Sequence, residues 1–141
     1  MTDHRPADRW TEDDTRPLWH LAEEEHWQEA LRTGSYTRST RGRTLAQEGF
    51  IHCSYPDQLP GVAKAHYQGV TEPLVVLEID PTWLAKALIE VRLEPAHPEE
   101  PDSPHFPHVY GELPVHAVTR TRPATVEKGW LDLGPWRDQV G

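Results

Sequence analysis

The sequence has little of several features that define common protein classes. It has one cysteine, Cys53, which excludes an internal disulfide and suits a reducing cytosol. It has no apolar run of about 18 residues, the length that a membrane-spanning helix needs. Its first ten residues lack the hydrophobic stretch of a secretory signal. We therefore expect a cytoplasmic protein with no membrane partner.

Basic residues are also scarce, since 14 lysines and arginines stand against 23 acidic residues, for a net charge of −9. The overall field of such a chain repels nucleic-acid phosphates, so nucleic acid is not indicated as a partner. Arg38, Arg41 and Arg43 form the one dense basic cluster. This cluster is either a solvated loop or a contact for an anion or phosphate.

The length of 141 residues corresponds to one domain. Residues 1–16 carry charges, threonine and proline, and we expect a flexible N-terminal extension there. Residues 17–121 are expected to form a single domain. Residues 122–141 contain two tryptophans, which predict a C-terminal tail that packs on the domain.

Hydrophobic patterning predicts short elements of both kinds. The apolar run Leu74–Leu77 indicates a strand that is covered on both faces. The segment 23–34 predicts a helix, because acids open it and Gly34 stops it. The proline-rich segment 95–107 is expected to be neither helix nor central strand. Because long βαβ repeats and a glycine-rich turn are absent, the order of elements favours an α+β fold over a doubly wound sheet.

Polar side chains occupy central positions in two of the apolar strands. His20 lies in LWHL, and His52 lies in FIHCS with Ser54 two residues later. Residues two apart on a strand share a face, as do His108 and Tyr110 in the later strand. A buried histidine is costly unless it is hydrogen-bonded. The pattern therefore indicates either a shared polar cleft or a set of satisfied core histidines.

Metal binding and nucleophilic catalysis would be different uses of these residue types. Nine histidines invite zinc or iron, but the spacings HxH, HExxH and paired cysteines do not occur, and we expect no metal. Cys53 would point away from His52 and toward the core, where a thiol is normally inert. Ser54 lacks the GxSxG elbow of a hydrolase triad.

Four segments resemble one small bacterial family, domain-of-unknown-function family 952. They are LWHLAEEEHWQEALRTGSY, LAQEGFIHCSYPDQL, LVVLEID and FPHVYGEL, and the resemblance covers residues 17–121. It implies the fold of ADP-ribosyltransferases and RNA 2′-phosphotransferases, which is a split, mainly antiparallel sheet with short helices that grips NAD. By the same resemblance, His20 would contact the ribose of NAD. His52 and Ser54 would match a second motif, and Arg43 would face phosphate.

The first hypothesis is thus an NAD-dependent transferase of the ADP-ribosyl or RNA 2′-phosphotransferase class, with NAD as a substrate in a His-lined cleft. Tyr36 or Tyr55 would stack on the nicotinamide, and Glu94 or Glu112 would orient the acceptor and stabilise an oxocarbenium-like centre. The remaining substrate-binding candidates are Gln58, His108 and Tyr110. The second hypothesis is a small-molecule enzyme that uses His, Glu and Tyr for acid–base catalysis without NAD. The third is a non-catalytic binding module.

Overall fold

The computed structural model describes residues 15–138, and all its strand pairings are antiparallel. The main sheet has the order β1-β4-β8-β10, with β9 also paired to β8. Its strands are β1 (Leu18–Glu23), β4 (Leu74–Ile79), β8 (Val118–Glu127), β9 (Trp130–Leu133) and β10 (Arg137–Asp138). A second sheet has the order β3-β6-β5, and a two-stranded ribbon joins β2 to β7. These strands are β2 (Ser35–Tyr36), β3 (Ile51–His52), β5 (Glu90–Pro95), β6 (His105–Tyr110) and β7 (Leu113–Pro114).

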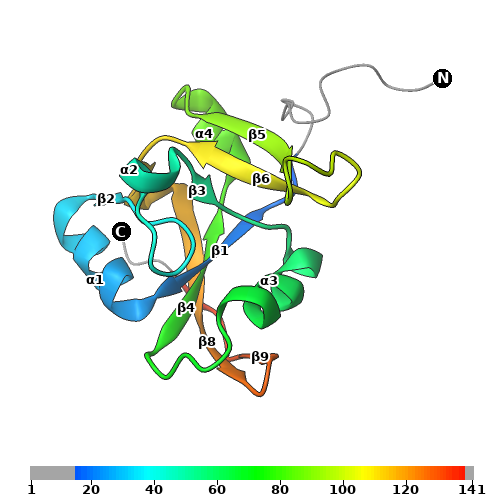
Figure 1. Ribbon diagram of the computed structural model, residues 1–141. Coiled ribbons are helices and arrows are strands. Elements are labelled where there is room, and N and C mark those ends of the chain that lie inside the picture. The colour runs from blue at the N-terminus through cyan, green and yellow to red at the C-terminus, as the bar shows by residue number, and fades with distance from the viewer. Residues whose placement is uncertain (1–14, 139–141) are drawn as a thin grey trace.

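The helices are few and short. They are α1 (Glu24–Thr33), α2 (Leu45–Glu48), α3 (Leu59–His66) and α4 (Pro81–Lys86), with 3-10 turns at Pro56–Gln58 and Val115–Ala117. In Figure 1, α1 and α3 lie on either side of β1 and β4, and β5 and β6 cross the upper part of the molecule. The described residues therefore form one α+β domain, as expected.

Local sequence explains where the helices begin and end. Two acids open α1 at its positive end, and Gly34 closes it in the left-handed conformation, with φ of 95° and its N–H donated to the Ala30 carbonyl. A capping box joins Thr44 to Gln47 at the start of α2. That box holds the single helical turn of α2.

The main sheet separates two hydrophobic clusters. Val75 and Leu77 of β4 pack in the cluster that includes Trp27 of α1, whereas Leu74 and Val76 pack in the cluster that includes Leu59 of α3. Successive side chains of a strand point to opposite faces, so these clusters cover the two faces of the sheet. The prediction from the apolar run is confirmed, because all four residues are buried.

The prediction for the proline-rich segment was wrong at its end. Pro107 lies inside β6, which is the central strand of the second sheet. Its carbonyl accepts a hydrogen bond from the Cys53 N–H at 3.0 Å, one residue beyond the end of β3. The N–H and C=O of a strand residue point to the same side of the strand. The N–H that Pro107 lacks would therefore have pointed toward β3, which ends at His52. The proline therefore interrupts no continuous ladder.

The structure can be compared with the expected boundary at the C-terminal end but not with most of the expected N-terminal extension. Residues 1–14 of the expected N-terminal extension lie outside the described residues, as do residues 139–141. The boundary expected after residue 121 falls within β8, and that strand continues with β9 in the main sheet. After β9, Gly134 lies close to Pro123 of β8, and its N–H donates to the Pro123 carbonyl at 2.8 Å.

Candidate active site

One face of the second sheet carries most of the polar candidates. His52 of β3 lies opposite His108 of β6, and Glu94 of β5 lies opposite Phe106, two residues before His108. Paired residues share a face of the sheet, and so do residues two apart on one strand. The register therefore brings His52, His108, Glu94 and Tyr110 to one face, although they come from three separate strands.

These side chains form a continuous relay of hydrogen bonds. Glu94 Oε1 lies 2.7 Å from His108 Nδ1, and Tyr110 donates its hydroxyl to the same oxygen at 2.6 Å. His108 Nε2 lies 3.0 Å from His52 Nδ1. A carboxylate only accepts hydrogen bonds, so His108 donates from Nδ1 and accepts at Nε2, and neutral His52 donates from Nδ1. This arrangement leaves the lone pair of His52 on Nε2.

The free end of the relay is unusual. His52 Nε2 is buried and has no hydrogen-bond partner among the described residues. Burial, followed by the nearby His108, lowers the pKa of His52 to about 3, so the imidazole is neutral near pH 7. Burial also lowers the pKa of His108, and Glu94 opposes that shift. A buried lone pair without a partner is costly in a folded protein, which makes it a candidate for function.

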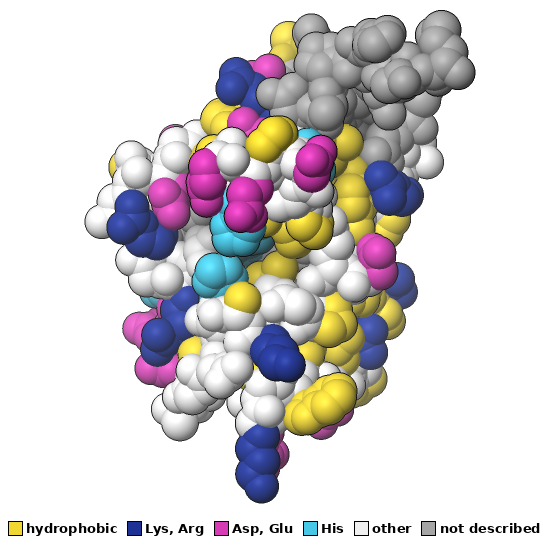
Figure 2. All heavy atoms as spheres, turned by 45° about the vertical axis from the view of Figure 1, so that its right-hand side comes forward, with side chains coloured by type: hydrophobic (Ala, Val, Ile, Leu, Met, Phe, Trp, Pro, Cys, Tyr) yellow, Lys and Arg dark blue, Asp and Glu magenta, His cyan; other side chains and the backbone are white. Residues whose placement is uncertain are grey.

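His52 and His108 also line a pocket of about 710 Å³. Apolar side chains from α3, from β6 and from the residue before β3 contribute to its wall. They include Phe50, Val62, Ala65 and Phe106. Figure 2 shows histidine and hydrophobic side chains around a hollow on this part of the surface, with acidic side chains along one border. The pocket has a size that suits a small molecule.

His20 occupies a different environment from His52. Its Nδ1 donates to the His52 carbonyl at 2.7 Å, and its Nε2 accepts from the Tyr36 hydroxyl at 2.8 Å. The side chain is buried, and burial lowers its pKa to about 4. Both ring nitrogens are therefore occupied within the core. The ribose contact that the family resemblance implied for His20 stays a prediction.

Among the other predicted residues, Gln58 lines the large pocket, whereas Ser54, Tyr55 and Glu112 do not. Ser54 is buried, and its hydroxyl donates to the Trp19 carbonyl at 3.4 Å. The ring of buried Tyr55 lies 3.7 Å from the guanidinium carbon of Arg16. Gln58 lines the large pocket and donates to the His105 carbonyl at 2.8 Å. Glu112 is exposed and lines neither this pocket nor the smaller one near Arg43. Their assigned roles stay predictions.

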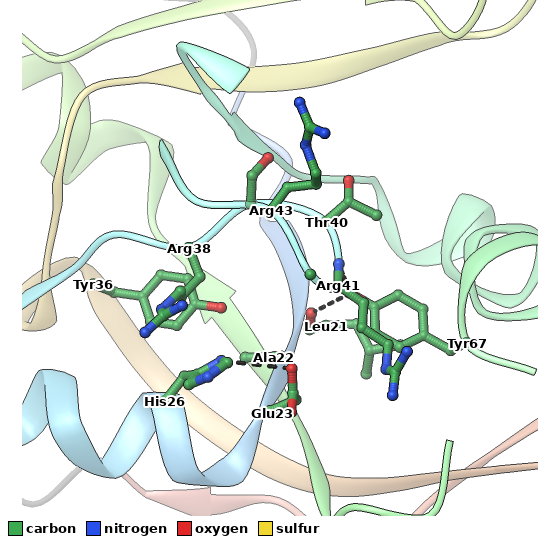
Figure 3. A pocket seen from close by; sticks show the side chains of 12 residues that line it. Leu21, Ala22, Glu23, His26, Tyr36, Arg38, Thr40, Arg41, Arg43 and Tyr67 are labelled. Carbon is green, nitrogen blue, oxygen red and sulfur yellow. Dashed lines mark hydrogen bonds and ion pairs between the residues drawn. The ribbon is translucent and has the colours of Figure 1, made fainter. Parts of the chain in front are cut away.

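Tyr36 and Arg43 belong to a second, smaller pocket beside the basic loop, which is the segment 38–43 that carries Arg38, Arg41 and Arg43 (Figure 3). Tyr36 is buried, and burial raises the pKa of its hydroxyl. Arg43 is exposed and pairs with Glu48 at 3.5 Å. The structure thus separates these two residues from the relay.

Sequence reasoning missed two residues that hold the relay in place. The Phe50 ring stacks on His108 with centroids 4.0 Å apart, and buried Ser39 accepts a hydrogen bond from the His52 N–H at 3.1 Å. Phe50 precedes His52 by two residues, so strand alternation could have placed it on the same face. No local signal pointed to Ser39, because its contact depends on how the basic loop folds back.

The thiol lies where strand alternation predicts it. Cys53 is buried, and burial raises the pKa of its thiol. Within residues 15–138, no three His, Cys, Asp or Glu side chains are arranged to hold a metal ion. No helix in that range is both long enough and apolar enough to cross a membrane.

The fold and the site define a small α+β protein with a buried histidine relay at the wall of a pocket. The chain belongs to the family described as "Protein of unknown function (DUF952)", whose model matches residues 21–121. It is similar to the crystal structure of protein CC0527 from Caulobacter crescentus, with 22% identity and a TM-score of 0.66. The match covers 82% of this chain and 93% of that chain.

A double mutant of the same Caulobacter crescentus protein matches with 21% identity, the same coverage and the same TM-score. At these identities the likeness shows the fold alone. No curated protein matches the chain. The expected family membership is confirmed.

Proposed function

We propose that this protein is an acid–base enzyme for a small uncharged molecule, with His52 Nε2 as the base. The observation that carries the proposal is the buried, unpartnered lone pair at the end of the Glu94–His108–His52 relay. The lowered pKa keeps the His52 imidazole neutral near pH 7, so its Nε2 lone pair is available to accept a proton. The proposal corresponds to the second of the three hypotheses from the sequence.

The relay accounts for each proton in the step. His52 Nε2 takes a proton from the bound molecule, or from a water beside it, and becomes an imidazolium that still donates from Nδ1 to His108. His108 donates in turn to Glu94, whose negative charge stabilises the cation through the intervening ring. The same proton then returns from Nε2 to the product. Tyr110 and Phe50 hold Glu94 and His108 in position.

The lining of the pocket supports an uncharged substrate. Among the described residues, no lysine or arginine lines it, and its two carboxylates are Glu48 and Asp57. Arg43 pairs with Glu48 from outside the lining. An anionic ligand would therefore enter without a compensating cation, whereas the aromatic and aliphatic walls favour apolar surface.

NAD-dependent transfer is a second candidate function, and it rests on the family resemblance described above. Its distinguishing requirement is a diphosphate beside the His-lined cleft. Calorimetric titration of NAD into the wild type and His52→Ala tests it directly. Micromolar binding that is lost in the variant would favour the transferase over the acid–base enzyme.

The acid–base proposal is tested with 4-nitrophenyl acetate, an uncharged aromatic ester. Water attacks the ester carbonyl while His52 accepts one of its protons; the ester C–O bond then breaks, His52 returns that proton to the departing 4-nitrophenolate, and acetic acid and 4-nitrophenol are released. We expect His52→Gln to slow the release of 4-nitrophenol about 100-fold, because a positioned general base contributes at least that much. His97→Gln is the matched control, since His97 lines the same pocket outside the relay.

Equal rates for the wild type and His52→Gln would overturn the proposal, provided that both variants unfold cooperatively at similar temperatures. A loss of activity in His97→Gln as large as that in His52→Gln would also overturn it, because the relay would then have no special role.

A further inference from the structure

The basic loop encloses a second pocket, of about 90 Å³, whose chemistry is opposite to that of the large one. Arg38, Arg41 and Arg43 line it, and Glu23 supplies its one carboxylate among the described residues. Thr40 lines both pockets, so the loop forms the wall between them. Three arginines thus line one small cavity in a chain whose net charge is −9.

The loop is held in a defined shape by its own backbone. The Arg43 N–H donates to the Thr40 carbonyl at 2.8 Å, and Gly42 has a φ of 81°, which is typical of the third residue of a type II turn. The Arg41 N–H contacts the Tyr67 hydroxyl at 3.2 Å, and the Ser39 N–H donates to the Arg43 carbonyl at 2.9 Å. These bonds fix the positions from which the arginine side chains extend.

Arg38 differs from the other two arginines in its surroundings. Arg41 pairs with Glu72 at 3.6 Å, and Arg43 pairs with Glu48 at 3.5 Å. No carboxylate in the described part of the chain pairs with Arg38, although its side chain is half-buried. In Figure 3 its guanidinium lies beside Tyr36 and faces the side of the pocket where His26 lies.

The one carboxylate of the pocket is partly occupied. Glu23 lies 3.6 Å from His26 Nδ1, and Figure 3 shows this pair at the side of the pocket away from Arg43. Glu23 therefore opposes only part of the positive charge of the three arginines. The volume of the pocket suits one tetrahedral anion.

We propose that this small pocket binds a phosphate group, with Arg38 as the main contact. A guanidinium presents paired N–H donors that match phosphate oxygens, and half-burial strengthens such charge-assisted bonds. Arg41 and Arg43 also line the pocket, each paired with a glutamate. The proposal does not depend on the histidine relay, since none of the relay side chains lines this pocket.

Calorimetric titration with inorganic phosphate at low ionic strength tests the site. We expect Arg38→Gln to weaken phosphate binding at least about tenfold, which is the cost of losing one charged hydrogen bond. Arg32→Gln is the matched control, because Arg32 is an exposed arginine of α1 that lines neither pocket. His52→Gln should bind phosphate as the wild type does, which separates this test from that of the proposed enzyme.

A parallel titration with phenyl phosphate identifies the source of the phosphate. Tighter binding of the ester than of the inorganic ion means that the pocket holds the phosphate of an organic molecule, and equal or weaker binding means that it holds the free ion. The proposal is overturned if the wild type binds neither at millimolar concentrations, or if Arg32→Gln weakens binding as much as Arg38→Gln does.

Discussion

Acidification should destabilise this protein through its buried neutral histidines. The pKa of His20 is about 4 and that of His52 is about 3 in the folded chain, while an unfolded histidine titrates near 6.5. Between those values the unfolded chain binds protons that the folded chain does not. Stability therefore falls as the pH drops below about 6.5, and the loss continues until the folded-state pKa values are reached.

The size of the effect follows from these pKa values. At about pH 5, each of the two imidazoles lowers the free energy of unfolding by about 2 kcal/mol relative to neutral pH. The pKa of His108 is also lowered by burial, so it acts in the same direction. Carboxyl groups with ordinary pKa values remain largely ionised at that pH, and the histidines should dominate the change.

Urea unfolding at about pH 7.5 and about pH 5, followed by tryptophan fluorescence, measures this loss. His52→Gln should lose about 2 kcal/mol less than the wild type on acidification, because glutamine does not titrate. His97→Gln should match the wild type, since His97 is exposed. If His52→Gln loses as much stability as the wild type, His52 is not a buried neutral imidazole, and the electrostatic basis of the relay fails.

Two further substitutions test the packing around the site and the sheet. Tyr36→Phe should lower the free energy of unfolding by about 1–3 kcal/mol, because it leaves buried His20 Nε2 without its donor; an unchanged urea midpoint would contradict this. Gly134→Ala should cost about 1–3 kcal/mol, because its Cβ would lie 2.5 Å from Pro123 Cγ. Gly61→Ala is the control in thermal unfolding, because a Cβ at that position of α3 meets nothing within 4 Å. Equal effects of Gly134→Ala and Gly61→Ala would refute the reasoning.

Much of the fold could be predicted from local sequence. The run Leu74–Leu77 predicted a strand covered on both faces, and Gly34 marked the end of α1, because both signals depend only on neighbouring residues. Pro107 was misjudged because the rule against proline in a central strand assumes a continuous neighbour. Here β3 ends after His52, and only the folded chain shows that.

The sequence by itself determined that His108 and Tyr110 share a face, since side chains two apart on a strand point to the same side. It could not determine that His52 meets His108, because 56 positions separate them and the register between β3 and β6 comes from long-range packing. Tertiary structure also placed His20 and His52, which occupy similar positions in the sequence, in different surroundings. His20 has partners on both nitrogens, whereas His52 retains a buried free nitrogen, because hydrogen-bond satisfaction depends on distant groups that only folding brings together.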